Sequence, residues 1–221
     1  MCGRFTLLAD ESDIQSNFQL THRIKGYKPS YNIAPGQEVL VIIHDGKQKR
    51  AGYLRWGLVP SWAKDEKVGY KMINARSETA HEKPSFKQLM ARKRCLIVAD
   101  SFYEWKQVGD VKQPQRIQVA NRSLFAFAGL WDKWQRDHRT LFTCTILTKD
   151  ANDFIKDIHH RMPIILPKAK EDEWITPYVQ SPIRLKQFLE EIVDEKLTAY
   201  PVDTYVNKAQ NNDEGCIKPL K

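Results

Sequence analysis

Short apolar runs separated by turn residues make up much of the chain between residues 39 and 147. Residues 39–44 form one such run, which ends at Asp45 and Gly46, a pair typical of a hairpin turn. Residues 51–58 follow as the partner strand, and the same pattern predicts further strands at residues 94–99, 102–106, 116–120, 124–131 and 141–147. Runs of this length joined by tight turns favour a mainly antiparallel sheet.

Helical patterns are shorter and lie mostly at the edges of this strand-rich region. Asp10 can cap a short helix that places Ile14 and Phe18 on one face. The same kind of signal predicts further helices at residues 85–92, 150–158 and 170–175. None of these segments is long enough to dominate the fold.

Two residues mark helix starts in the second half of the chain. Asp150 is the candidate cap of residues 150–158, and Ser181 followed by Pro182 begins the clearest helix. The apolar stripe of that helix consists of Ile183, Phe188, Leu189 and Ile192. Residues 31–36, in contrast, predict a loop. The signals together predict an α+β fold, with a curved, mainly antiparallel sheet or partial β-barrel and short peripheral helices.

The length and composition predict one domain in a reducing compartment. With 221 residues and neither a linker nor an internal repeat, the chain is expected to form a single domain over residues 1–221. No apolar run approaches the ~20 residues that span a bilayer, and the first residues do not form a signal peptide, so we expect a cytoplasmic protein without a membrane partner. The scattered cysteines argue against a metal site and against a disulfide framework: Cys2, Cys95, Cys144 and Cys216. We expect Cys95 and Cys144, which lie in apolar runs, in the core.

The charge favours a polyanionic partner. The formal net charge is +8, and nucleic acid is the commonest partner of so basic a chain. Aromatic residues such as Trp56, Trp62 and Trp105 lie near basic ones, as in proteins that stack bases on rings while cations neutralise phosphates. Each tryptophan is equally a candidate core residue, so the pattern indicates nucleic acid without proving it.

The second residue carries the most distinctive chemistry of the chain. Once an aminopeptidase removes Met1, Cys2 has a free α-amine and a thiol on adjacent carbons. Such a 1,2-aminothiol forms a Schiff base with an aldehyde, and the thiol then closes a thiazolidine ring. An α-amine titrates near ~8 and a thiol near ~8.5, so both reactive forms exist at neutral pH. The alternative is a cysteine in a frayed terminus that has no role.

Three polar clusters lie where the pattern places loops or strand ends. Asn74 and Arg76 are two residues apart and point to the same face if the segment is extended. Glu104 lies among aromatic residues, and an apolar pocket would raise its pKa toward that of a general acid. The alternative for this glutamate is a solvent-facing carboxylate paired with a neighbouring lysine. His159 and His160 follow a predicted helix, and the second is the candidate for a purely structural histidine.

These segments together resemble one known family. The chain carries Met-Cys-Gly-Arg-Phe at 1–5, Trp-Gly-Leu-Val-Pro at 56–60, Ile-Asn-Ala-Arg-Ser-Glu-Thr at 73–79, Phe-Tyr-Glu-Trp-Lys at 102–106 and Asp-Ile-His-His-Arg-Met-Pro at 157–163. With the segment 31–35, these ordered motifs resemble the SOS-response-associated peptidase (SRAP) family from residue 2 to Val206 and Asn207. Members of that family are abasic-site processing proteins that crosslink to DNA.

The resemblance implies a covalent reaction that needs no cofactor. Cys2 would capture the ring-opened aldehyde of an abasic site in single-stranded DNA as a thiazolidine and so protect the lesion, with strand cleavage by β-elimination as a side activity. By motif, Asn74 would hydrogen-bond near the Cys2 backbone and the opened sugar. Glu104 would shuttle protons, and His159 would bind the sugar hydroxyl. The implied DNA contacts are Arg4, Pro35, Trp56, Arg76, Thr148 and Arg161.

Two other functions are compatible with the same residues. Cys2 as a nucleophile, with Glu104 and His159 nearby as acid or base, would also suit a peptidase or amidase. The cleavage expected of such an enzyme is the removal of its own Met1. A non-covalent binder of single-stranded nucleic acid would use charge and stacking alone and would leave no covalent product. A monomer is sufficient for each of the three.

Overall fold

The strand-rich part of the chain closes into a five-stranded barrel. In the computed structural model, which describes residues 2–220, hydrogen bonds join strands in the order β10–β4–β3–β6–β9, and β9 pairs back with β10. The β4–β10 pairing is parallel and the other pairings of the ring are antiparallel. The strands are β3 (Glu38–His44), β4 (Lys49–Trp56), β6 (Arg94–Ala99), β9 (Phe125–Arg136) and β10 (Arg139–Asp150). The predicted fold class is confirmed.

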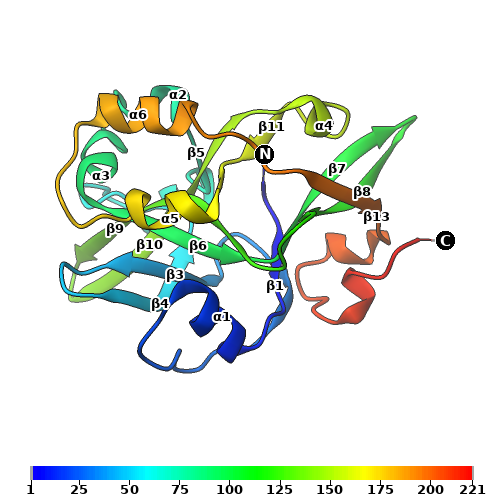
Figure 1. The fold of residues 1–221 in the computed structure, drawn as a ribbon, viewed down its shortest axis with the longest axis horizontal. Helices are drawn as coiled ribbons and strands as arrows, with labels where there is room; N and C mark the ends of the chain where they lie inside the picture. The colour runs from blue at the N-terminus through cyan, green and yellow to red at the C-terminus, as the bar shows by residue number, and fades with distance from the viewer. Residues whose placement is uncertain (1, 221) are drawn as a thin grey trace.

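A second, antiparallel sheet contains the N-terminal strand. Its order is β13–β8–β7–β1–β2, with β1 (Phe5–Leu7), β2 (Ser30–Ile33), β7 (Ser101–Val108), β8 (Val111–Val119) and β13 (Leu197–Pro201). Figure 1 shows β7 and β8 as a hairpin that extends away from the barrel. Strand β2 corrects the predicted loop at residues 31–36. Phe5 pairs with Ile33, so β1 provides a hydrogen-bonding edge that the local sequence does not reveal.

Three short strands extend the barrel sheet. They are β5 (Asn74–Arg76), β11 (Arg161–Pro163) and β12 (Ile165–Leu166). Strand β5 runs parallel to β10, β11 runs antiparallel to β10, and β12 pairs with β9. The end of β10 is therefore flanked by two segments that carry predicted site residues, because Thr148 faces Arg76 on one side and Pro163 on the other.

The helices are short and peripheral, as predicted. They are α1 (Glu11–Phe18), α2 (Ser77–Ala80), α3 (Lys87–Arg92), α4 (Asp153–Lys156), α5 (Lys168–Trp174) and α6 (Pro182–Glu190). Figure 1 shows α2, α3, α5 and α6 gathered on one side of the barrel and α1 on another. Residues 2–220 also contain three short 3-10 helices: η1 (Glu66–Lys71), η2 (Thr204–Asn207) and η3 (Glu214–Cys216).

Two details of the helix predictions are wrong. Asp150 is the last residue of β10, and Asn152 caps α4 instead, because its side chain accepts the N–H of Ile155. In α6 the buried positions are Leu185 and Leu189, four residues apart, whereas Ile183 is 63% exposed. Two positions along a helix are a turn of about 200°, so Ile183 points away from the face that Leu185 buries.

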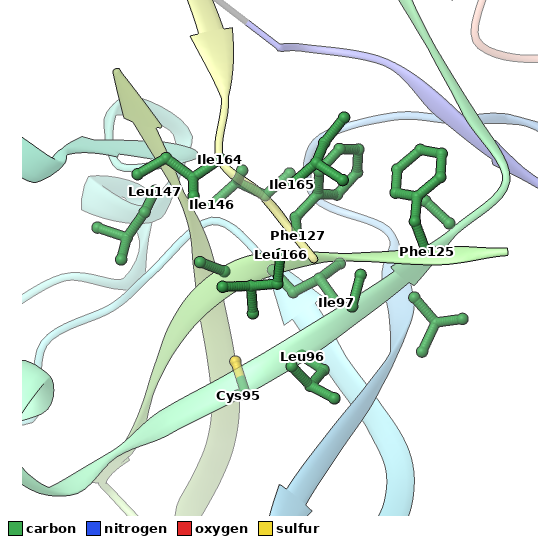
Figure 2. Packing of buried hydrophobic residues seen from close by; sticks show 14 of the residues in the cluster. Cys95, Leu96, Ile97, Phe125, Phe127, Ile146, Leu147, Ile164, Ile165 and Leu166 are labelled. Atoms are coloured by element: carbon green, nitrogen blue, oxygen red, sulfur yellow. The ribbon is translucent and has the colours of Figure 1, made fainter. Parts of the chain in front are cut away.

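The barrel interior forms the hydrophobic core. Figure 2 shows Cys95, Leu96 and Ile97 of β6 packed with Phe125 and Phe127 of β9 and with Ile146 and Leu147 of β10. Cys95 and Cys144 are fully buried there, as predicted. Among residues 2–220, no helix is long and apolar enough to cross a membrane.

Candidate functional site

Cys2 lies immediately before β1, at the point where the second sheet meets the barrel core. The hydrogen bond from Tyr103 N–H to Arg4 O, at 2.9 Å, continues the β1–β7 pairing toward Cys2. The Cys2 side chain is fully buried and belongs to the main hydrophobic cluster. Burial raises the pKa of its thiol, and the negative charge of Glu104 raises it further. The thiol is therefore held in its protonated form.

Asn74 holds the backbone of Cys2. Its Nδ2 donates to the Cys2 carbonyl oxygen at 2.9 Å. The contact joins residues 72 positions apart, and it forms because β5 aligns Asn74 with Ile146 of β10. Arg76, two residues along the same strand, is exposed. The segment is extended as β5, which is the condition under which Asn74 and Arg76 lie on one face.

Glu104 lies in β7 and is 2% exposed. This burial excludes the alternative of a solvent-facing carboxylate paired with a lysine. Burial also raises the pKa of Glu104 to about 7. A carboxyl with this pKa exchanges its proton readily at neutral pH, which is the property required of a general acid or base.

His159 follows α4 and is anchored through one ring nitrogen. The Arg161 N–H donates to Nδ1 of His159 at 2.9 Å, and the Arg161 carbonyl oxygen lies 3.1 Å from the same atom. Burial lowers the pKa of His159, which favours the neutral ring. In that form Nδ1 accepts and Nε2 carries the proton. The ring of the exposed His160 stacks on His159 with centroids 4.3 Å apart.

Glu104 and His159 line the same open depression, whose volume is about 470 Å³. The remaining lining residues are Trp105, Lys112 and Asn207. The indole Nε1 of Trp105 donates to Oδ1 of Asn207 at 2.7 Å. None of these three was among the predicted site residues, although Trp105 was recognised as the aromatic neighbour of Glu104. Lys112 and Asn207 reach the depression only because the β7–β8 hairpin and η2 fold next to each other.

Two of the arginines expected at DNA phosphates are engaged inside the protein. Arg4 Nη1 donates to Asn32 Oδ1 and to Val206 O, each at 2.8 Å. Arg161 is 4% exposed, and its guanidinium binds the Glu78 carboxylate, Asp150 Oδ1 and Thr148 O. Thr148 itself is fully buried. Of the predicted arginines, Arg76 is the one whose side chain is exposed.

The tryptophan predicted to contact bases lies in the core. Trp56 is 1% exposed, donates from Nε1 to Ile73 O at 2.8 Å and packs against Phe5 with ring centroids 5.2 Å apart. Trp62, only six residues later, is 64% exposed. Tyr70 is also exposed and lies beside Gly36, next to the half-buried Pro35. Trp62 and Tyr70 were not among the predicted DNA contacts, and their exposure is decided by the tertiary fold.

The loop that carries Trp62 depends on a close approach of two glycines. Gly57 has φ +126°, and a Cβ built on it would lie 2.7 Å from Gly69 O. A side chain would meet backbone there, so the connection between β4 and β5 folds in this way because both positions lack one. Among residues 2–220, there is no group of three or more His, Cys, Asp or Glu residues that could hold a metal ion.

Several proteins named abasic site processing protein are similar to this chain in sequence. The abasic site processing proteins YoqW and YoaM of Bacillus subtilis are 48% identical over 222 residues and 51% identical over 216 residues. YoqW is matched over 99% of each chain, and YoaM over 96% of this chain and 95% of its own. The abasic site processing protein HMCES of Gallus gallus is 33% identical over 88% of this chain and 67% of its own.

Solved structures share the fold. A crystal structure of a protein from Bacteroides thetaiotaomicron superposes with a TM-score of 0.89 over 100% of both chains, at 24% identity. A phage-related protein from Bordetella bronchiseptica superposes with a TM-score of 0.72 at 30% identity, over 91% of this chain and 94% of its own. The family model described as SOS response associated peptidase (SRAP) matches residues 1–209. The chain therefore belongs to the SRAP family.

Proposed function

We propose that this protein processes abasic sites in DNA and that it does so by covalent capture through Cys2. Relatives that match nearly the whole chain at 48% and 51% identity carry the name abasic site processing protein. The observation that carries the covalent proposal is the hydrogen bond from Asn74 to the Cys2 carbonyl. A hydrogen bond from another strand orders the Cys2 backbone, and a buried carboxyl acts on its thiol, which supports a chemical role for Cys2 over that of a frayed terminus.

The proposed reaction joins the aldehyde of the opened abasic sugar to Cys2 after removal of Met1. The α-amine attacks the aldehyde carbon, and the carbinolamine loses water to form an iminium ion. The thiol sulfur then bonds to the same carbon and closes the thiazolidine ring. The net reaction consumes one aldehyde and one aminothiol and releases one water, so it requires neither an oxidant nor a reductant.

Glu104 is proposed to move the protons of both steps. In its neutral form it protonates the leaving hydroxyl of the carbinolamine, and as a carboxylate it then takes the proton of the Cys2 thiol. It ends in the protonation state in which it began. Its pKa of about 7 supports this double role, because neither form is strongly favoured at neutral pH. The raised pKa of Cys2 supports the order of events, with the amine reacting first and the thiol second.

His159 is proposed to bind the sugar as a hydrogen-bond donor. Its Nδ1 accepts from the backbone N–H of Arg161, and its Nε2 is the proposed donor to a substrate oxygen. A donor at the sugar hydroxyl would favour the ring-opened form. Arg161, held by Glu78 and Asp150, supports this orientation from within the protein.

The proposed DNA path uses side chains that are at least partly exposed. Arg76 is proposed as a phosphate contact, and Trp62 with Pro35 as the surface against which bases stack. Arg4, Arg161, Thr148 and Trp56 remain predicted contacts, but their burial or internal hydrogen bonds favour structural roles. Single-stranded DNA is the proposed substrate, since stacking on an exposed ring requires an unpaired base.

The test is intact-protein mass spectrometry after mixing the protein with single-stranded DNA that bears one abasic site. We expect a species at the summed mass of the DNA and the protein without Met1, minus one water. Cys2→Ala should not form it, whereas Cys144→Ala, which alters a barrel cysteine, should. Binding of the same DNA without any covalent product would contradict the proposal and favour a non-covalent binder.

The same variants separate the peptidase alternative. A Cys2-dependent peptidase or amidase would hydrolyse peptide substrates and would lose that turnover in Cys2→Ala. Retention of Met1 in a protein whose Glu104 is replaced would indicate that the chain removes its own methionine. Strand cleavage at the abasic site, measured on a denaturing gel, reports the proposed lyase side activity.

A further inference from the structure

A segment near the C-terminus is tied to the N-terminal strand by a dense set of hydrogen bonds. Arg4, two residues after the proposed nucleophile, donates from Nη1 to Val206 O and to Asn32 Oδ1, each at 2.8 Å. Asn32 Nδ2 is within 3.1 Å of the carbonyl oxygens of Val206, Lys208 and Asn211. We name residues 204–216 the C-terminal clasp. Its contacts with Arg4 and Asn32 join residues at least 174 positions apart.

Both ends of the clasp are anchored on β2. Asn212 Oδ1 accepts the N–H groups of Tyr31 and Asn32 at 2.7 and 3.1 Å and the Ser30 hydroxyl at 3.0 Å. Asn32 is 1% exposed, so its amide satisfies the clasp carbonyls in a buried setting. These carbonyls have further donors, namely Arg4 Nη1 at Val206 O, the Asn211 N–H at Lys208 O and the Cys216 thiol at Asn211 O, so Asn32 is one part of a connected network. The clasp is therefore attached to the second sheet by hydrogen bonds with β2.

The clasp carries one wall of the proposed site. Asn207, the residue after Val206, accepts the indole N–H of Trp105 at 2.7 Å, and both line the depression that contains Glu104 and His159. Arg4 therefore binds the carbonyl of Val206, and the next residue, Asn207, accepts the hydrogen bond that orients the Trp105 ring. Hydrogen bonds therefore link the segment that carries Cys2 and Arg4 to the wall that carries Asn207 and Trp105.

We propose that Arg4 and Asn32 are positioning residues, which hold the clasp so that Asn207 and Trp105 keep the sugar of the abasic site against Cys2 and Glu104. This inference rests on the proposed covalent function. It assigns the Arg4 charge to oxygen atoms of Asn32, Val206 and Asn207 and not to a DNA phosphate. Arg76, which is exposed on β5, is the arginine that we compare with Arg4, because its proposed role is to bind a DNA phosphate.

The experiment separates positioning from binding by measuring two quantities for each variant. One is the crosslinking rate at saturating abasic single-stranded DNA, and the other is the Kd for the same strand without a lesion. Arg4→Lys and Asn207→Ala should slow crosslinking by roughly 10- to 100-fold while changing Kd less than about twofold. Arg76→Gln should weaken Kd, and Arg184→Gln, on the exposed part of α6, should change neither quantity. Asn207 is exposed, so its variant is expected to fold.

Hydrogen exchange shows whether the clasp is released. Amides of residues 204–216 should exchange faster in Arg4→Lys and Asn32→Ala than in the wild type, while those of the barrel strands should not change. Asn207→Asp, which keeps the oxygen that accepts from Trp105, should restore a rate nearer the wild type than Asn207→Ala does.

Two results would overturn the inference. One is a wild-type saturated rate in both Arg4→Lys and Asn207→Ala. The other is a weakened Kd with a smaller salt dependence in Arg4→Gln, which removes the charge, because that result would make Arg4 a phosphate contact. If the wild type forms no crosslink at all, the proposed function fails instead, and the exchange measurement still tests whether Arg4 and Asn32 hold the clasp.

Discussion

Cys144 in the barrel and Cys2 at the site are equally buried, and the difference between them lies in what surrounds each thiol. Both are fully inaccessible, and burial raises the pKa of both. Burial is the cause for Cys144, whereas the charge of Glu104 also acts on Cys2. Burial alone therefore does not mark a nucleophile. What distinguishes the surroundings of Cys2 is the buried carboxyl of Glu104 and the depression that Glu104 lines.

The same contrast separates the two regions as a whole. The barrel interior is lined by apolar side chains from β6, β9 and β10, whose removal from water stabilises the fold. The region around β1, β5 and β7 buries polar groups as well, among them Glu104 and Asp100. Burial raises the pKa of both carboxyls. In the barrel interior the apolar surroundings stabilise the fold, and around β1, β5 and β7 burial raises the proton affinity of the Glu104 and Asp100 carboxyls.

The largest expected effect is the difference between the alanine variants of Cys2 and Cys144. Cys2→Ala should abolish crosslinking, because the aminothiol loses its sulfur, and should leave at most a reversible imine. Cys144→Ala should lower the free energy of unfolding by roughly 1–3 kcal/mol and keep the crosslinking rate. Mass spectrometry and denaturant unfolding measure the two outcomes. A crosslink that survives in Cys2→Ala would show that the two thiols do not differ in the way argued.

Glu104→Gln should slow crosslinking by roughly 10²- to 10⁴-fold, since the group that donates and accepts the protons is lost. It should also make the protein more stable at alkaline pH. An unfolded glutamate titrates near ~4.3, and Glu104 in the folded protein titrates at about 7. Folding therefore takes up a proton between these values, and wild-type stability falls as the pH rises through this window.

The stability measurement for Glu104→Gln has a defined sign. The variant should exceed the wild type by roughly 1–3 kcal/mol near about pH 8, and the difference should shrink toward about pH 4. Urea unfolding at several pH values tests this. A variant that is less stable than the wild type at alkaline pH would mean that the buried carboxylate is stabilised by its surroundings and that its pKa is not raised.

Two tryptophans sharpen the comparison between core and surface. Trp62→Ala should weaken binding of single-stranded DNA by the roughly 1–3 kcal/mol of one stacked base, about 5- to 150-fold, and leave thermal stability nearly unchanged. Trp56→Ala should lower the free energy of unfolding by roughly 3–5 kcal/mol, because it empties a buried site. Fluorescence anisotropy and thermal melts separate these effects. Equal affinity in Trp62→Ala would remove it from the DNA path.

The smallest expected effect concerns one exposed arginine. Arg76→Glu should weaken DNA binding a few-fold, about 3- to 10-fold, regardless of base sequence, and should reduce the slope of log Kd against log salt by about one. Arg184→Glu, on the exposed part of α6, is the matched charge reversal and should change neither quantity to that extent. Similar effects of the two variants would indicate general electrostatics instead of a contact at Arg76.

Much of the fold could be predicted from local patterns, whereas the grouping of the candidate site residues was implied by the family resemblance. Short apolar runs and turn residues located the barrel strands. The closure of the barrel could not be predicted, because the parallel β4–β10 pairing joins segments almost ninety residues apart. The contact between Asn74 and Cys2 depends on a pairing of the same kind, and the motifs alone could only imply it.

Charge and aromaticity were the least informative sequence properties. Arg4, Arg76 and Arg161 look alike in the sequence, yet one is exposed and two are bound to oxygen atoms of the protein. Trp56 and Trp62 differ by six positions, and the first ends a barrel strand while the second lies in the loop that follows. Which role each plays depends on neighbours that are distant in the chain.

The sequence by itself determined the chemistry that this protein can offer: a cysteine after the initiator methionine, a glutamate between aromatic residues, a histidine before Arg161 and an excess of positive charge. The tertiary structure decided where these side chains lie and which groups surround them. It buried Glu104, attached Asn74 to Cys2 and turned Arg4 inward to the clasp. The physical reason is that reactivity begins with the atoms of a side chain, whereas pKa, exposure and hydrogen-bond partners belong to the environment that distant segments build around it.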